Sequence, residues 1–226
     1  MNRRELLLCL AAAAGLSGCA QRAPSWVREP GAQYGGPTAL PPPTLDGTVS
    51  LEHALALRRS IREFRPDPLP IATVGQLLWA GQGITSTDGK RTAPSAGALY
   101  PLELYAVTPS QVVHYLPHGH RIEARATADL RPQLRTAAFG QDHVATAPLV
   151  VVIAAVEGRT RRKYGPRANA FVEREVGHAA QNILLTAAAF QLAAVPVGSV
   201  DATRAAITLA VPPDQRVHYL LPIGVR

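Results

Sequence analysis

Three arginines and a serine lie within five residues near position 60, and together they have the chemistry to bind a phosphate. In an extended chain the side chains of Ser60 and Arg62 point to one side and that of Ile61 to the other. Guanidinium groups such as those of Arg58, Arg59 and Arg62 donate paired hydrogen bonds to phosphate oxygens. The segment therefore predicts a phosphate site. The alternative is a solvated helix end, whose arginines face the negative end of the helix dipole.

Two further segments are rich in small residues, which allow backbone N–H groups to approach a flat or anionic ligand closely. The first is 94–101, with the sequence PSAGALYP, directly before a predicted strand. The second is 195–198, with the sequence VPVG, after a long predicted helix. A glycine at the end of a strand often marks the close passage of a ligand. An ordinary loop and a strand-end turn are the respective alternatives.

Two patterns resemble metal sites but predict none. His118 and His120 flank a glycine between strand-like segments, and we interpret them as a turn because no carboxylate or cysteine is near in sequence. Glu175 and His178 have the spacing of a di-iron helix, but such a site needs a second copy of the pattern. Cysteines occur only at positions 9 and 19, which excludes a structural disulfide in the rest of the chain.

The N-terminus has the layout of a secretory signal: a basic start, an apolar run over 6–16 and the sequence LSGC over 16–19. This predicts a lipoprotein signal peptide over residues 1–18 and a lipid on Cys19, which anchors the protein in the bacterial cell envelope, facing the periplasm or the exterior. The alternative is a generic signal peptide with an incidental cysteine. Arg3 and Arg4 are compatible with twin-arginine export of a folded domain.

The rest of the 226-residue chain divides by composition into a tether and one domain. Residues 19–48 hold six prolines from Pro24 to Pro43 without an apolar period, and they predict an extended tether. Residues 49–226 form the predicted domain. The net charge of +7 comes from scattered arginines without an aromatic-rich basic tract, which argues against nucleic acid as a partner.

The elements that must position these residues follow from apolar periodicity. Helices are predicted over 51–58, 71–80, 129–139 and 176–192, with a short helix starting near Asp201. Strands are predicted over 102–108 and 112–116 as a hairpin, over 148–156 as a strand buried on both faces, and over 195–200 and 217–223. This order predicts an α+β fold with a mostly antiparallel central sheet flanked by helices.

Seven segments together resemble the nitroreductase-like flavoproteins, specifically their SagB-type dehydrogenase branch. They are RRSIREF (58–64), LLWAGQGIT (77–85), RTAPSAGALYPLELYAV (91–107), KYGPRA (163–168), GHAAQNILLTAA (177–188), VPVGS (195–199) and LPIGVR (221–226). Their order covers essentially the whole predicted domain, and PSAGALYP is the most specific to this branch. The resemblance implies an FMN-dependent oxidoreductase that forms an intertwined homodimer, with each flavin at the subunit interface.

The resemblance also assigns roles to particular positions. Four residues match the segment that holds the FMN phosphate and ribityl chain: Arg58, Arg59, Ser60 and Arg62. Three match a loop that the other subunit places against the flavin: Ser95, Ala96 and Gly97. Three match the stretch beside the isoalloxazine ring: Pro196, Val197 and Gly198. The last residue, Arg226, matches a basic residue that reaches the phosphate, although its own carboxylate competes for it.

Lys163 and Tyr164 match a lysine–tyrosine pair of those family members that oxidise azoline rings. A lysine serves as a base and a tyrosine as a proton relay when burial and neighbouring charge lower the lysine pKa. The favoured alternative is a basic surface patch at the start of a helix, since Arg161 and Arg162 indicate an exposed face.

The sequence thus predicts a flavin oxidoreductase that transfers a hydride or electrons through flavin N5, to or from a small molecule, a quinone or a peptide-derived substrate. Export separates it from cytoplasmic NAD(P)H and from cytoplasmic peptide-modifying enzymes, which favours a redox partner at the membrane, such as a quinone. The alternative is a catalytically inactive, lipid-anchored flavin-binding or assembly protein.

Overall fold

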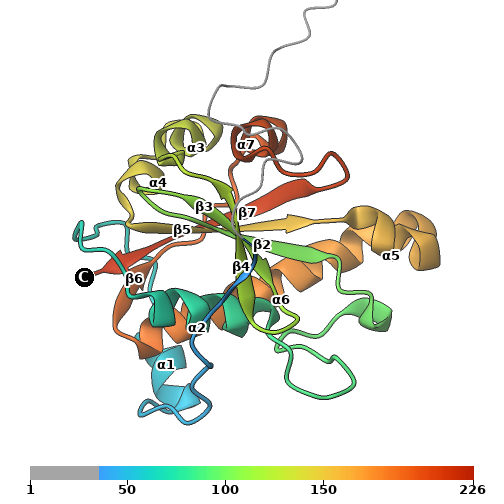
Figure 1. Cartoon of the computed structure of the whole chain (residues 1–226), viewed down its shortest axis with the longest axis horizontal. Coiled ribbons are helices and arrows are strands. Elements are labelled where there is room, and N and C mark those ends of the chain that lie inside the picture. Colours follow the sequence, from blue (N-terminus) through green and yellow to red (C-terminus); the bar gives the residue numbers. More distant parts are fainter. Residues whose placement is uncertain (1–35) are drawn as a thin grey trace, which may run out of the picture.

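A seven-stranded sheet forms the centre of the part of the chain that the structure, a computed structural model, describes: residues 36–226 (Figure 1). The strands are β1 (Thr38–Ala39), β2 (Leu102–Val107), β3 (Val112–Leu116), β4 (Arg121–Ala126), β5 (Leu149–Ala155), β6 (Leu192–Ala194) and β7 (Arg216–Val225). Their spatial order is β1-β4-β3-β2-β5-β7-β6, and every neighbouring pair is antiparallel. The predicted antiparallel sheet is confirmed.

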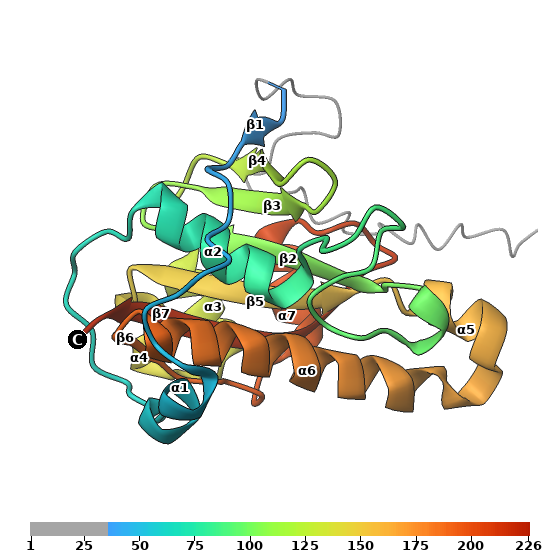
Figure 2. The same cartoon turned by 90° about the horizontal axis from the view of Figure 1, so that it is seen from below.

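Helices cover both faces of this sheet. They are α1 (Leu51–Leu57), α2 (Ile71–Gln82), α3 (Arg131–Ala137), α4 (Asp142–Thr146), α5 (Glu157–Tyr164), α6 (Ala168–Ala189) and α7 (Ala202–Leu209), with 3-10 turns η1 (Ala96–Ala98) and η2 (Gly165–Arg167). Helices α2 and α6 lie on one face and α3 and α7 on the other, while α1 packs against α6 (Figures 1 and 2). The α+β class is confirmed.

Strand β5 explains why two helical layers are needed. Its seven residues are all apolar and all buried. Val151 and Ile153 belong to the core under α2 and α6, whereas Val150 and Val152 belong to the core under α3, α4 and α7. A strand that is apolar on both faces must be covered twice to remove its side chains from water.

The packed domain begins earlier than residue 49. Strand β1 pairs with β4, and Leu40 is only 7% exposed in the core. The backbone of Thr44 exchanges two hydrogen bonds with the side chain of Gln76, at 2.8 and 3.0 Å. The end of the expected tether is therefore part of the fold, because pairing with a distant strand supplies contacts that its composition does not reveal. The predicted signal peptide, Cys19 and the rest of the tether lie outside the described residues.

Most predicted elements are found near their expected positions, with two informative differences. The long helix α6 starts at Ala168, eight residues before its expected start, and ends at Ala189. Strand β6 covers Leu192–Ala194 rather than the expected 195–200. After Ala194 only Val197 forms a further bridge to β7. Pro196 has no N–H group to donate to a neighbouring strand, so regular pairing does not continue through it.

Across residues 36–226, no helix is both long enough and apolar enough to cross a membrane.

Candidate functional site

The predicted phosphate segment lies along the sheet edge formed by β6 and the end of β7. Helix α1 ends at Leu57, with Arg58 as its C-cap, and the chain then runs extended beside β6, where the N–H of Ile61 donates to the Ala194 carbonyl at 3.0 Å. Farther along, the N–H of Arg65 donates to the Val225 carbonyl at 2.9 Å. Residues 58–65 therefore lie beside both the VPVG segment and the C-terminal Arg226, which the sequence had placed far apart.

The arginines of this segment do not share one role. The side chain of Arg59 donates to the carbonyls of Ala56 and Arg58, at 3.1 and 2.8 Å, so it closes the end of α1 as the helix-end alternative expected. By contrast, Arg58, Arg62 and Arg226 form no ion pair with any carboxylate of the described chain. Unneutralised guanidiniums at one edge suit a dianionic group such as a phosphate.

The positive charge of Arg62 changes the pKa of a histidine on a neighbouring helix. Burial lowers the pKa of His143 in α4, and the positive charge of Arg62 lowers this pKa further. The Nε2 atom of His143 is buried without a hydrogen-bond partner in the described chain. Arg62 therefore lies close to α4, although its own side chain is exposed.

The VPVG segment offers a backbone donor next to these cations. The N–H of Val197 donates to Leu220 at 2.8 Å, and Val195 donates to Pro222 at 3.1 Å. Gly198 is exposed, and its N–H donates to no backbone or side-chain group of the described chain. A Cβ at this position would lie 3.2 Å from the ring of Tyr219. The bare glycine backbone is thus open to a flat ligand that carries hydrogen-bond acceptors.

The loop at 95–97 is held by a buried carboxylate. The N–H of Ala96 donates to Oε1 of Glu175 in α6 at 2.8 Å, and the hydroxyl of Ser95 accepts from the N–H of Tyr100 at 2.9 Å. Gly97 has φ +63°, a left-handed conformation that glycine adopts without strain. Glu175 is only 4% exposed. The spacing of Glu175 to His178, its only distinctive feature in the sequence, gives no sign of this role.

The loop at 95–97 also meets the lysine–tyrosine pair. A Cβ at Gly97 would lie 2.8 Å from Nζ of Lys163 and 2.9 Å from Oη of Tyr164. Both residues close the last turn of α5, not the start of a helix as the surface-patch alternative supposed, although Lys163 is exposed as that alternative expected. The structure therefore brings the two segments together.

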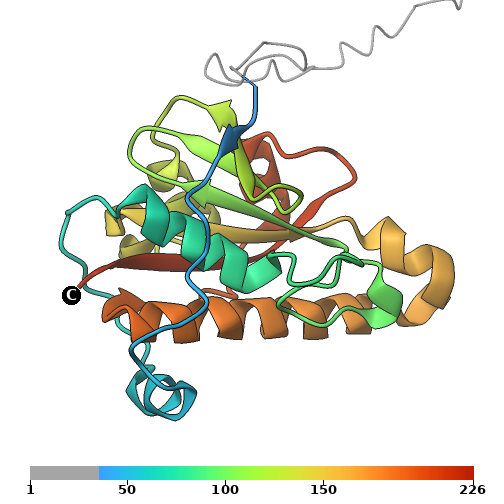
Figure 3. The same ribbon diagram turned by 60° about the horizontal axis from the view of Figure 1, so that its bottom comes forward.

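These residues form two groups at different places along α6, visible as the long orange helix in Figures 2 and 3. The loop at 95–97 is attached at Glu175, whereas the arginine and VPVG segments lie beyond the helix end at Ala189. Fourteen residues separate Glu175 from Ala189, or about 21 Å along a helix. One chain does not bring the two groups into contact.

Glu175 gives a test of how the loop is anchored. Burial raises the pKa of Glu175, while hydrogen bonds from Ala96 and Ser95 oppose the rise. A raised pKa means that the fold disfavours the charged form, so its cost is present above the folded pKa and relieved as the pH falls. Glu175→Gln keeps an acceptor for Ala96 without the charge, and we expect a melting temperature at pH 7 equal to or above that of the unsubstituted protein.

The matched variant is Glu175→Ala, which leaves the Ala96 N–H without its partner. We expect this variant to lose about 1–3 kcal/mol of unfolding free energy. Thermal and urea unfolding at pH 7 measure both variants. Equal losses for Gln and Ala would show that Glu175 does not act through this hydrogen bond.

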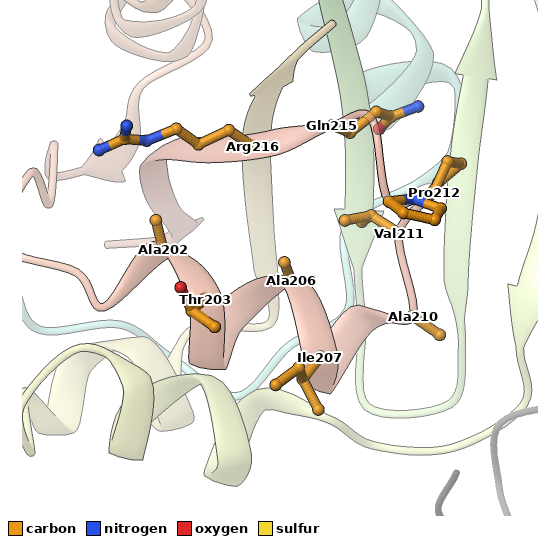
Figure 4. Close-up of a pocket in the computed structure, with 10 residues that line it drawn as sticks. Ala202, Thr203, Ala206, Ile207, Ala210, Val211, Pro212, Gln215 and Arg216 are labelled. Carbon is orange, nitrogen blue, oxygen red and sulfur yellow. The ribbon is translucent and has the colours of Figure 1, made fainter. Parts of the chain in front are cut away.

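Two cavities of the described chain are lined by residues that belong to neither group. A cavity of about 560 Å³ lies between α7 and the start of β7, lined by small and apolar side chains with Arg216 at its edge (Figure 4). An apolar groove of about 340 Å³ lies between the start of α2 and the β2–β3 turn. No predicted site residue lines either one. The His118–His120 segment forms the predicted turn between β3 and β4, in which Nδ1 of His120 is 2.9 Å from the Tyr115 hydroxyl.

Comparison with known proteins agrees with this architecture. A protein of Methanocaldococcus jannaschii with the provisional name of a nitroreductase is 40% identical over 157 residues, which cover 67% of this chain and 79% of that protein. A crystal structure from Ralstonia eutropha, also provisionally named a nitroreductase, is 31% identical with a TM-score of 0.77, and the match covers 84% of this chain and 89% of that one. The NADPH:FMN oxidoreductase of Vibrio harveyi, solved with NAD+, shares the fold at 20% identity and a TM-score of 0.59, over 77% of this chain and 68% of that one.

The sequence profile of the Nitroreductase family matches residues 55–225, which include both groups of site residues. With this match and the relative at 40% identity, the chain belongs to the nitroreductase family of flavin-binding oxidoreductases.

Proposed function

We propose that the protein is an FMN-dependent oxidoreductase of the SagB-type branch, in which two copies of the chain complete each flavin site. The observation that carries the proposal is the edge where Arg58, Arg62 and Arg226 remain unneutralised beside the free N–H of Gly198. This donor set matches a ligand with a phosphate at one end and a flat ring with acceptors at the other. The residues present therefore fit FMN.

Each part of the edge has its own task in this proposal. Arg58 and Arg62 bind the phosphate, with Arg226 beside them, while the hydroxyl of Ser60 donates to the ribityl chain. The N–H of Gly198 donates to an acceptor of the ring and fixes its orientation, and the neighbouring Pro196 and Val197 exclude water from that side. FMN supplies hydride transfer when bound; the protein supplies position and electrostatics.

A second copy of the chain supplies the other wall of the site. The loop of Ser95, Ala96 and Gly97 is attached to α6 at Glu175, about 21 Å along the helix from its end at Ala189, and the arginine edge of the same chain lies beyond that end. In a homodimer it would lie against the flavin held by the other copy. Lys163 and Tyr164, which touch this loop, are then placed to hold and move a proton at the substrate.

The decisive experiment is the absorption spectrum of the purified full chain. We expect flavin bands with about one FMN per chain, and reoxidation of the reduced protein by a quinone such as menadione. Protein that is colourless and takes up no added FMN would contradict the proposal. Bound flavin that is neither reduced nor reoxidised would favour the inactive, lipid-anchored binding or assembly protein.

The location of the protein at the cell envelope is a separate part of the proposal. Residues 1–18 act as a lipoprotein signal peptide, Cys19 carries the lipid, and the tether ends where β1 joins the sheet at Thr38. Because the proposed site holds FMN between two folded copies of the chain, we expect FMN to bind before the protein is exported. Arg3 and Arg4 are compatible with the twin-arginine route, which carries folded proteins. The substrate is then met outside the cytoplasm, where a quinone or a peptide-derived molecule is a suitable redox partner.

Replacing both Arg3 and Arg4 by lysine tests the export route. We expect the variant to remain in the cytoplasm with its flavin bound, because the twin-arginine route depends on the arginine pair. Cell fractionation together with flavin fluorescence measures this result. Cys19→Ala, as the control, should still be exported but should lack lipid. A lysine variant that reaches the membrane lipidated and yellow would exclude twin-arginine export.

A further inference from the structure

Four side chains at the junction of α5 and α6 form a continuous row, in which two adjacent aromatic rings lie between two cations. Nζ of Lys163 lies 5.6 Å from the centre of the Tyr164 ring. The Tyr164 ring meets that of Phe171 edge to face, with 4.8 Å between their centres. The guanidinium of Arg174 lies 5.5 Å from the centre of the Phe171 ring. We call Lys163, Tyr164, Phe171 and Arg174 the basic row.

The two cations of the basic row are not neutralised by carboxylates of the described chain. Within residues 36–226, neither Lys163 nor Arg174 forms an ion pair with a carboxylate. Two other cations of α5 are neutralised, since Arg159 pairs with Glu103 at 2.6 Å and Arg161 with Glu157 at 3.3 Å.

Glu173, the carboxylate next to Arg174 in the sequence, pairs with another residue and does not neutralise Arg174. Glu173 lies 3.0 Å from Nδ1 of His218, on β7. The exposed Arg162 and Arg167 add further positive charge to the same junction without a carboxylate partner in the described chain. An aromatic face restrains a cation without cancelling its charge, so the row presents fixed positive charge to solvent.

The basic row lies at the loop that we propose faces the flavin of the other copy. Lys163 and Tyr164 are the side chains that a Cβ on Gly97 would touch. Arg174 precedes Glu175, which anchors the same loop through Ala96. The positive charge of the row therefore lies beside the wall of the proposed site that a substrate must pass.

We propose that the basic row binds the anionic group of the redox substrate, and that the enzyme therefore prefers substrates bearing a phosphate, carboxylate or sulfonate to neutral ones. This inference rests on the proposed flavin site, and it names the substrate class and assigns Arg174 to its recognition. Charge at the entrance of a site raises the association rate of an oppositely charged ligand and loses its effect in salt.

The test uses the full chain loaded with FMN and chemically reduced, with two quinones as acceptors. One is neutral 1,4-naphthoquinone, and the other is its 2-sulfonate. In each case two electrons and two protons pass from the reduced flavin to the quinone, which becomes the hydroquinone. The measured quantity is the second-order rate constant of flavin reoxidation by the sulfonate divided by that for the neutral quinone, a ratio that removes effects common to both acceptors.

We expect Arg174→Glu to lower this ratio by about fivefold to tenfold at low salt, and the difference to shrink at high salt. The control is Arg204→Glu, which reverses an exposed charge on α7, across the sheet, that forms no ion pair within residues 36–226 and should leave the ratio unchanged. If Arg174→Glu fails to fold, Arg174→Gln measures the same effect at about half its size. NADPH and NADH as donors show whether a phosphate is recognised in the same way, because they differ by one phosphate.

The outcomes separate this inference from the function on which it rests. A lower ratio in the Arg174 variants alone supports the basic row as the anion site. An equal ratio in the unsubstituted protein and in the Arg174 and Arg204 variants, all with bound flavin, overturns the inference and leaves the oxidoreductase intact. A chain that takes up no FMN overturns the proposed function and the inference with it.

Discussion

Arg62→Ala is expected to weaken FMN binding by about 10-fold to 100-fold while leaving the fold intact. Hydrogen bonds to a charged group contribute about 1.5–3 kcal/mol, and each 1.4 kcal/mol corresponds to a factor of ten in the dissociation constant. Arg62 is exposed and forms no ion pair with the described carboxylates, so its loss should not change the melting temperature of the flavin-free protein. Fluorescence titration with FMN measures the affinity.

Arg65→Ala is the matched control for this prediction. Arg65 lies on the same extended segment, but its Nε atom is 2.9 Å from Asp67, which neutralises it. We expect the affinity for FMN to stay within about twofold of the unsubstituted protein, because exposed ion pairs contribute little. Equal losses for the two variants would show that Arg62 has no particular role. A second signal is independent of FMN: removing Arg62 should raise the pKa of His143, which NMR titration measures.

Gly224→Ala is expected to lower the free energy of unfolding by about 3 kcal/mol, because the added methyl group has no space. Its Cβ would lie 2.6 and 2.9 Å from Cδ and Cγ of Pro148 and 3.0 Å from Cβ of Phe64. None of these atoms is the end of a flexible side chain, so β7 or its neighbours must shift. For a domain of this size the loss corresponds to a melting temperature about 6–12 °C lower. Because Phe64 continues from the arginine segment, the affinity for FMN should also fall.

The control is a substitution of another glycine, for which we expect a gain of stability instead of a loss. Gly177 lies within α6, and a Cβ there meets nothing within 4 Å. Gly177→Ala should stabilise the protein by about 0.5–1 kcal/mol, because alanine loses less backbone entropy in a helix than glycine does. Differential scanning calorimetry measures both variants. If the Gly224→Ala protein has the same melting temperature as the unsubstituted chain, the β7 edge accommodates the methyl group without cost. Its packing then does not fix the arginine segment.

The sequence by itself determined the local elements and the residue types of the site. The unbroken apolar run of β5 required burial on both faces, and the strand is buried on both faces. The helix caps are also local, since the side chains of Ser50 and Asp201 accept hydrogen bonds from the N–H groups of His53 and Arg204, three residues farther along. Such signals are local, because helix and strand periods and caps involve residues close in the chain.

Only the tertiary structure decided which of these residues meet. Ala96 and Glu175 are 79 residues apart in sequence, and no periodic pattern links a loop N–H to a carboxylate on a distant helix. Likewise, β1 belongs to the domain because it pairs with β4, although its own composition is that of a tether. Among the arginines, the sequence could not separate Arg59, which closes α1, from Arg62, which remains unpaired. The physical reason is that residue type fixes what a group can bind, whereas strand order and helix length fix its neighbours.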